Sequence, residues 1–141
     1  SNQAMKNDLT QQMTESFEGH AQETENGIEY WLARDVQHLL GYTKWDDFLN
    51  VISKAKTACE LSEHSIPDHF ADVGKMVELG SGSQREISDI MLTRYACYLI
   101  AQNGDPAKQA IAFALQTRKA ELIEKRLTLV PTLLRGNAYG A

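Results

Sequence analysis

The sequence is poor in cysteine and proline and has no long hydrophobic run. Only two cysteines and three prolines occur among its 141 residues. Cys59 and Cys97 belong to no CxxC pair, which argues against a disulfide framework and suits a reducing cytosol. A zinc site built from Cys59, His64 and His69 would have one thiolate and no known finger spacing, so we expect no metal. No apolar run approaches the roughly 20 residues that span a bilayer, and the polar N-terminus is unlike a secretory signal. We therefore expect a cytoplasmic protein without membrane contact, with association with the nucleoid left open.

The sequence also lacks the short motifs of the common enzyme classes. It has no phosphate-binding GxxxxGK[ST] loop, no glycine-rich dinucleotide turn, no HExxH and no GxSxG. Four histidines and 19 acidic residues are present, but no spacing among them proposes a catalytic site. We therefore predict that the protein is not an enzyme and uses no cofactor.

Positive charge is scarce and unevenly placed. The chain has 14 basic and 19 acidic residues, for a net charge of −5. Residues 1–30 hold one lysine against six acids, and residues 31–90 hold six basic residues against ten acids. Residues 91–141 hold seven basic residues against three acids. This basic end suits phosphate contacts, because each neutralised phosphate releases condensed counterions.

The candidate nucleic-acid-binding residues are six basic residues of this last third and one arginine beside a predicted turn. They are Arg94, Lys108, Arg118, Lys119, Lys125, Arg126 and Arg85. A solvated helix face is the alternative, since Glu121 and Lys125 are spaced to pair along a helix.

The hydrophobic pattern predicts an α+β fold, a mainly helical domain of about five helices with a small β-hairpin. We predict helices over 8–20, 32–40, 43–59, 93–102 and 106–127, a brief strand over 28–32, and a hairpin from 76–79 and 86–90 around a flexible tip at 80–84. Residues 1–5 are interpreted as an expression scar, 6–25 as an acidic N-terminal segment, 26–130 as the domain and 131–141 as an irregular tail.

The predicted helices 32–40 and 43–59 have the sequence shape of a helix-turn-helix. Thr43, three residues before Asp46, resembles a capping box that would start the second helix. A recognition helix places its first residues between phosphate rows, where Asp46 and Asp47 would be repelled. We therefore predict that this pair is architectural and does not read DNA.

Residues 92–108 contain the signals for a short helix, for its end and for the start of a second helix. Thr93 is a natural N-cap for an apolar helix, because its side-chain oxygen can accept a backbone N–H of the first turn. Asn103-Gly104 suits the left-handed conformation that ends a helix, and Asp105-Pro106 suits a new helix start. We expect two helices to meet at a sharp corner here.

A set of motifs over roughly residues 16–120 carries a family resemblance. The motifs are Tyr30-Trp31, Ala33-Arg34-Asp35, Leu39-Leu40-Gly41-Tyr42, Trp45, Phe48, Asp68-His69-Phe70, RYACYLIAQNGDPAK at 94–108, and Gln116-Thr117-Arg118. Together they resemble the bacterial DNA-damage-inducible protein D family, whose N-terminal half is similar to the Bro-N and phage antirepressor domains. The resemblance therefore marks 26–130 as a Bro-N-like domain.

The resemblance implies a role in the bacterial DNA-damage (SOS) response through binding DNA or a regulatory protein, and it brings no catalytic residues. Relatives continue into a longer C-terminal region, so we expect the native C-terminal region to be missing here. At Ala114-Leu115 relatives carry about five further residues. Either a deletion or omitted residues would explain that join, and a deletion would turn Arg118 and Lys119 by about 140° around the helix.

Two functional hypotheses follow. The first is a non-enzymatic regulator that engages DNA, single- or double-stranded, or a DNA-bound repair or recombination protein, mainly through the basic helix after Pro106. The second is an antirepressor-like protein-interaction module that uses the acidic segment 6–25 and has no direct DNA contact. Homo-oligomerisation stays open in both.

Overall fold

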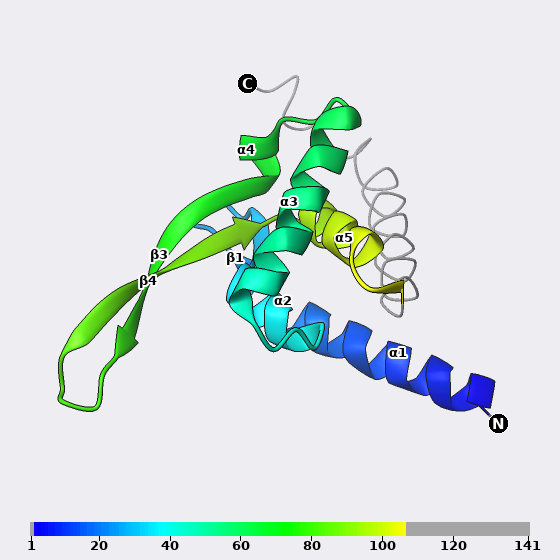
Figure 1. Cartoon of the computed structure of the whole chain (residues 1–141), viewed down its shortest axis with the longest axis horizontal. Coiled ribbons are helices and arrows are strands. Elements are labelled where there is room, and N and C mark those ends of the chain that lie inside the picture. Colours follow the sequence, from blue (N-terminus) through cyan, green and yellow to red (C-terminus); the bar gives the residue numbers. More distant parts are fainter. Residues whose placement is uncertain (1, 107–141) are drawn as a thin grey trace, which may run out of the picture.

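The computed structural model describes residues 2–106 and contains helices and one antiparallel sheet (Figure 1). The elements in chain order are α1 (Asn2–Gly19), β1 (Gln22–Glu23), β2 (Glu29–Leu32), α2 (Ala33–Leu39), α3 (Trp45–Leu61), α4 (Ile66–His69), β3 (Phe70–Glu78), β4 (Gln84–Leu92) and α5 (Arg94–Asn103). The strands of the sheet follow the spatial order β1-β2-β4-β3. The predicted helix 106–127, the join at Ala114-Leu115 and the tail 131–141 lie outside the described residues, apart from Pro106 itself.

The hydrophobic core lies where the base of the sheet meets the helices. Trp31 of β2 is opposite Leu92 of β4, and both side chains are fully buried. Phe48 and Ile52 from α3 and Ile100 from α5 complete the centre of this core. α3 packs along α5, while α2 packs against β4 and α5 against β2. Burying such large apolar side chains is the main source of stability for a domain of this size.

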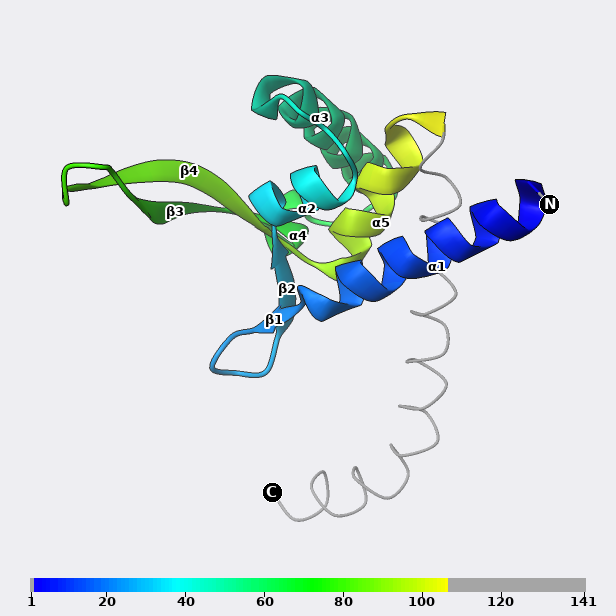
Figure 2. The ribbon, with the colours of Figure 1, turned by 90° about the horizontal axis from the view of Figure 1, so that it is seen from below.

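The mixed helix-and-sheet prediction is confirmed, but the predicted small hairpin understates the sheet. β3 and β4 each have nine residues and pair along their whole length, from Phe70 opposite Leu92 to Glu78 opposite Gln84. The pattern missed residues 70–75 of β3, because Ala71, Asp72 and Gly74 are exposed there and apolar and polar residues do not alternate regularly. Figures 1 and 2 show this hairpin extending away from the helices, while the N-terminal half of α1 projects in another direction.

Two predicted helix boundaries are confirmed. The Thr93 side chain accepts a hydrogen bond from the backbone N–H of Ala96 and caps α5. Gly41 follows α2 with a φ of +79°, a left-handed conformation that glycine adopts at little cost. Local sequence alone determines both boundaries, so the pattern could identify them.

Two other predicted boundaries are wrong. α3 begins at Trp45 with Lys44 at the N-cap, and no side chain caps it, so the Thr43 capping box does not form. Gly104 ends α5 with a φ of −93° and is not left-handed. A Cβ atom there would collide with the Tyr42 hydroxyl, so glycine is needed for close packing rather than for a positive φ.

Helices α2 and α3 are both present, but a helix-turn-helix arrangement is not shown. α3 packs chiefly against α5 and makes few contacts with α2. α1 begins at Asn2, six residues before the predicted helix start, and α4 was not predicted. Among residues 2–106, no helix is both long enough and apolar enough to cross a membrane.

Candidate nucleic-acid interface

The most prominent surface feature is the outer part of the β3–β4 hairpin, residues 74–88, which we call the arm. β2 pairs with β4 only at Met91 and Leu92, so neither edge of the hairpin has a strand partner along the arm among residues 2–106. The turn is built from glycine and serine, with Gly82 at a φ of +82° and the Leu79 N–H donating to the Ser83 carbonyl. A two-stranded ribbon of this kind is narrow enough to enter the major groove of DNA.

Arg85 is exposed on the arm, as its predicted role requires. It lies opposite Val77, in the pair next to Glu78 and Gln84, which end the pairing at the turn. Within residues 2–106 no carboxylate lies within ion-pair distance of its guanidinium. Arg85 is therefore available for an anion.

The base of the arm is held by Arg34. The Arg34 Nε donates to the carbonyl of Ser88 at 2.9 Å, and the guanidinium carbon lies 4.0 Å from the centre of the Trp45 ring. This cation–π contact and the hydrogen bond tie the start of α2, the start of α3 and β4 together. The direction of the arm relative to the helices is fixed by these contacts.

Asp89, beside that hydrogen bond, is buried and caps α2 from another element. Its Oδ1 accepts from the backbone N–H of Arg34 at 3.1 Å and from that of Ile90 at 2.8 Å. α2 has no side-chain cap of its own, because the residue at its N-cap is Leu32. The Asp89 carboxylate supplies the missing acceptor, and its Oδ2 has no hydrogen-bond partner in the described part of the chain.

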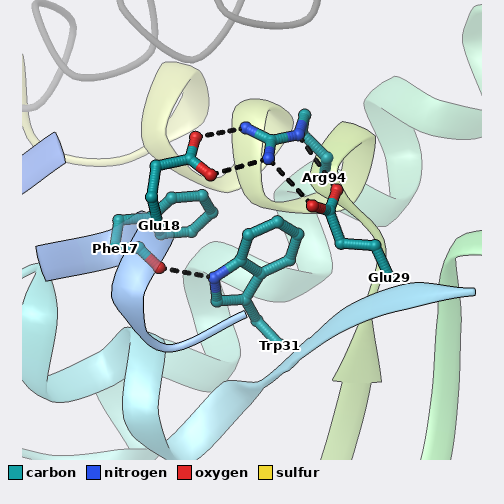
Figure 3. Close-up of polar contacts among 5 residues, drawn as sticks. All are labelled: Phe17, Glu18, Glu29, Trp31 and Arg94. Carbon is teal, nitrogen blue, oxygen red and sulfur yellow. Dashed lines mark hydrogen bonds and ion pairs between the residues drawn. The ribbon is translucent and has the colours of Figure 1, made fainter. Parts of the chain in front are cut away.

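Arg94, the other predicted binding residue within the described range, lies in a different setting. It is only 8% exposed, and its guanidinium binds both Glu18 and Glu29 (Figure 3). Hydrogen bonds of 2.5 and 2.8 Å join it to Glu18, and bonds of 3.1 and 3.0 Å join it to Glu29. Arg94 is thus committed to internal carboxylates, and we leave it out of the interface proposed below.

These ion pairs cover a stacked aromatic pair, and we call the five residues Phe17, Glu18, Glu29, Trp31 and Arg94 the clasp. The Phe17 and Trp31 rings are 4.4 Å apart and nearly parallel, and the Trp31 indole N–H donates to the Phe17 carbonyl at 2.7 Å (Figure 3). The Arg94 guanidinium lies 5.0 Å from the Trp31 ring centre. Burial alone would lower the pKa of Arg94, but the bidentate hydrogen bonds that its guanidinium donates to Glu18 and Glu29 hold that pKa above its usual value. The clasp fixes α1 to the sheet and α5.

The residues considered for zinc form no metal site. The His64 ring lies tilted against the Tyr95 ring and the His69 ring lies edge-on to it, with ring centres 4.6 and 4.9 Å away, and the His69 Nδ1 lies 2.7 Å from the Thr93 hydroxyl. No group of three or more metal-ligating side chains occurs among residues 2–106. Burial raises the pKa of the Cys59 thiol, so this residue does not favour the thiolate that metals bind.

The other predicted binding residues are Lys108, Arg118, Lys119, Lys125 and Arg126. All five lie outside the described residues, so their placement relative to the arm stays a prediction.

Comparison with known proteins connects this fold to a family. The profile of the BRO family, N-terminal domain, matches residues 20–121. The chain belongs to the BRO family. It is also 51% identical over 104 residues to DNA damage-inducible protein D of Escherichia coli (strain K12), which confirms the resemblance seen in the motifs. That match covers 70% of this chain but 38% of the relative, and no solved structure matches the chain.

The matched BRO range includes the sheet, the arm and helices α2 to α5, and it begins one residue after α1 ends. The clasp therefore joins a helix that precedes the matched range to the BRO domain. Several family-marking residues are structural: Trp31 and Phe48 are buried, and Trp45 packs on the core and under Arg34. Sequence reasoning missed the clasp, because Arg94 lies 65 and 76 residues from its two partners.

Proposed function

We propose that this BRO-family chain is a non-enzymatic regulator in the DNA-damage response that acts by binding DNA. The family match and the name of the 51% identical relative support a regulatory role connected with DNA damage. The match covers only 38% of that relative, so any activity of the whole relative is also only proposed for this chain.

The observation that carries the proposal is the separation of charge along the chain. Residues 2–106 have eight basic and 17 acidic residues, whereas residues 107–141 have six basic and two acidic residues. Phosphate would be repelled by most of the described surface and attracted to residues 107–141, which we call the basic segment. We propose that Lys108, Arg118, Lys119, Lys125 and Arg126 supply most phosphate contacts and that Arg85 on the arm adds one.

The deciding experiment compares the unmodified chain with a variant in which Arg118, Lys119, Lys125 and Arg126 are replaced by Ala. Fluorescence anisotropy with labelled single- and double-stranded DNA is measured over a series of salt concentrations. If all four residues contact a duplex, the slope of log K against log salt becomes shallower by about 3.6, since each phosphate contact contributes about 0.9. Equal slopes for the two proteins would refute phosphate binding by this segment.

A second candidate function, a protein-interaction module in the manner of an antirepressor, is favoured by the acidic N-terminal region. Asp8, Glu15, Glu23 and Glu25 are exposed, whereas Glu18 and Glu29 are bound by Arg94. Met5 and Leu9 lie on α1 with Asp8 and Glu15 and are 71% and 57% exposed. An acidic helix with exposed apolar residues suits a basic protein partner.

This second candidate is tested without damaging the clasp. The four exposed acids Asp8, Glu15, Glu23 and Glu25 are changed to their amides, which leaves Phe17 and Glu18 in place. The second candidate predicts that a partner retained after nuclease treatment is lost from this variant while DNA binding is unchanged. A partner retained equally by both proteins would rule out this surface as its contact.

A further inference from the structure

The register of the arm sorts its side chains by parity. Directly opposite residues of an antiparallel pair share one face, and here the paired residue numbers are both odd or both even, as in Lys75 with Ile87 and Met76 with Glu86. One face of the arm therefore carries the odd-numbered residues of β3 and β4, and the other face carries the even-numbered ones.

The two faces have opposite charge. The odd-numbered face carries Lys75 and Arg85 beside Val77 and Ile87, with Val73 directly before the arm on the same face. The even-numbered face carries Glu78 and Glu86, with Asp72 before the arm on that face. We call them the cationic face and the acidic face. The hairpin as a whole is slightly acidic, but this net value conceals a cationic face that has apolar residues around its two charges.

No exposed carboxylate of the hairpin lies on the cationic face. The one acidic residue among the odd-numbered positions of β3 and β4 is Asp89, which is 1% exposed and accepts backbone hydrogen bonds at the start of α2. Lys75 and Arg85 are diagonal neighbours across the two strands, at a typical separation of about 7–8 Å. Neither has an ion-pair partner among the residues that the structure describes.

The Glu78 and Glu86 side chains make their contacts with residues of their own, acidic face. The Glu86 side chain lies over Gly74, where any Cβ atom would overlap it, and Glu78 accepts from the Gln84 amide at 3.2 Å. A ligand that approaches the cationic face therefore meets two cations on a narrow ribbon whose base is held by Arg34 and Trp45.

We propose that the arm lies along the major groove of duplex DNA with its cationic face inward, where Lys75 and Arg85 each neutralise one backbone phosphate, and with its acidic face pointing outward. The inference rests on the proposed DNA-binding function and names a part of its contact surface. A duplex is favoured over a protein surface because the ribbon fits the major groove, about 12 Å wide, and because the charge of the exposed face is complementary to phosphate.

The test uses the complete chain and two double variants that remove the same charge. Lys75→Ala/Arg85→Ala alters the cationic face, and Lys44→Ala/Lys54→Ala is the control, since both of these lysines are exposed at or on α3 and neither belongs to the arm. Binding to a labelled duplex is measured between 50 and 200 mM salt. Losing two phosphate contacts makes the salt slope shallower by about 1.8, so the loss of affinity over this range shrinks about tenfold.

We expect the shallower salt slope for Lys75→Ala/Arg85→Ala and a much smaller change of slope for the control. Equal slopes for the two variants would overturn the inference while leaving the proposed function intact. No DNA binding by the unmodified chain at low salt would overturn both. Retained DNA binding together with loss of a nuclease-resistant protein partner would assign the face to a protein and would also overturn the inference.

Adjacent positions on β4 give a second readout that does not depend on charge. Ile87 lies on the cationic face and Ser88 on the acidic face. A photoreactive side chain placed at Ile87 should crosslink to the duplex, and the same group at Ser88 should not. Crosslinking from Ser88 alone would reverse the proposed orientation and overturn it.

Discussion

The clasp predicts that one carboxylate of α1 has a large effect on how this helix is held. The perturbation is Glu18→Gln, which keeps the size of the side chain and removes its charge. Glu18 makes both of its hydrogen bonds to the nearly buried Arg94 guanidinium, and its own side chain is 29% exposed. The substitution weakens one of the two acidic partners of Arg94 and leaves the other, Glu29, in place.

The expected cost lies between the values for exposed and buried ion pairs. Exposed pairs contribute up to about 1 kcal/mol, whereas breaking a buried pair costs about 3–5 kcal/mol. Because Glu18 is partly exposed and Glu29 remains, we expect Glu18→Gln to lower the free energy of undocking α1 by about 1–2 kcal/mol. This change raises the undocked population about 5- to 30-fold.

Hydrogen exchange at the α1 amides measures this population directly, and urea unfolding measures the effect on the whole domain. Glu15→Gln is the matched control, because Glu15 is exposed on the same helix and accepts from the Gln11 side chain at 3.2 Å. The control should change stability by less than about 0.5 kcal/mol. Equal α1 exchange rates in the two variants would refute the stabilising role of the clasp.

Three further predictions concern the core and the helix ends. Gly104→Ala should lower the free energy of unfolding by about 1–3 kcal/mol, because the new Cβ meets the Tyr42 hydroxyl, and an undiminished cost in a Tyr42→Phe background would contradict this cause. Asp89→Ala should cost about 1–3 kcal/mol in urea unfolding by leaving two backbone N–H groups without their acceptor, whereas Asp89→Asn should recover most of the loss. Burial raises the pKa of the Cys97 thiol, and that of Cys59, above the ordinary value of 9.0. The folded state thus keeps these thiols protonated where the unfolded chain ionises, so the free energy of unfolding should fall as the pH rises above 9, and a thiol reagent at pH 8 should react with both only after unfolding. Equal reaction rates in folded and unfolded protein would contradict this.

Features encoded by neighbouring residues could be predicted from the sequence. The cap of α5 depends on Thr93 and Ala96, and the end of α2 depends on the conformational freedom of Gly41. The helices α2, α3 and α5 follow from their apolar periodicity, and the turn of the hairpin follows from its glycine and serine residues. In each case the physical cause lies within a few residues of the effect.

Features that depend on distant partners could not be predicted. Gly104 is required by the hydroxyl of Tyr42, and α2 is capped by Asp89 from another strand. The sequence grouped Arg94 with the basic residues of 91–141, because nothing near it in the sequence indicates Glu18 and Glu29 as partners.

The charge separation of the arm belongs to the same class as these distant contacts. Each strand carries both a basic and an acidic residue, Lys75 and Glu78 in β3 and Arg85 and Glu86 in β4. From the sequence alone they suggest a surface of mixed charge, because the register of the two strands is not known. The strand register, rather than composition, determines that the two cations share one face.

The equilibrium binding of the unmodified chain to a labelled DNA duplex, measured over a series of salt concentrations, tests the central claim most directly. The proposal predicts binding at low salt and a fall of affinity with salt, with a slope of about −0.9 for every phosphate contacted. With contacts from the basic segment and from the arm, the slope should be several units negative. A protein that does not bind the duplex at low salt, or binds with a slope near zero, would contradict the account.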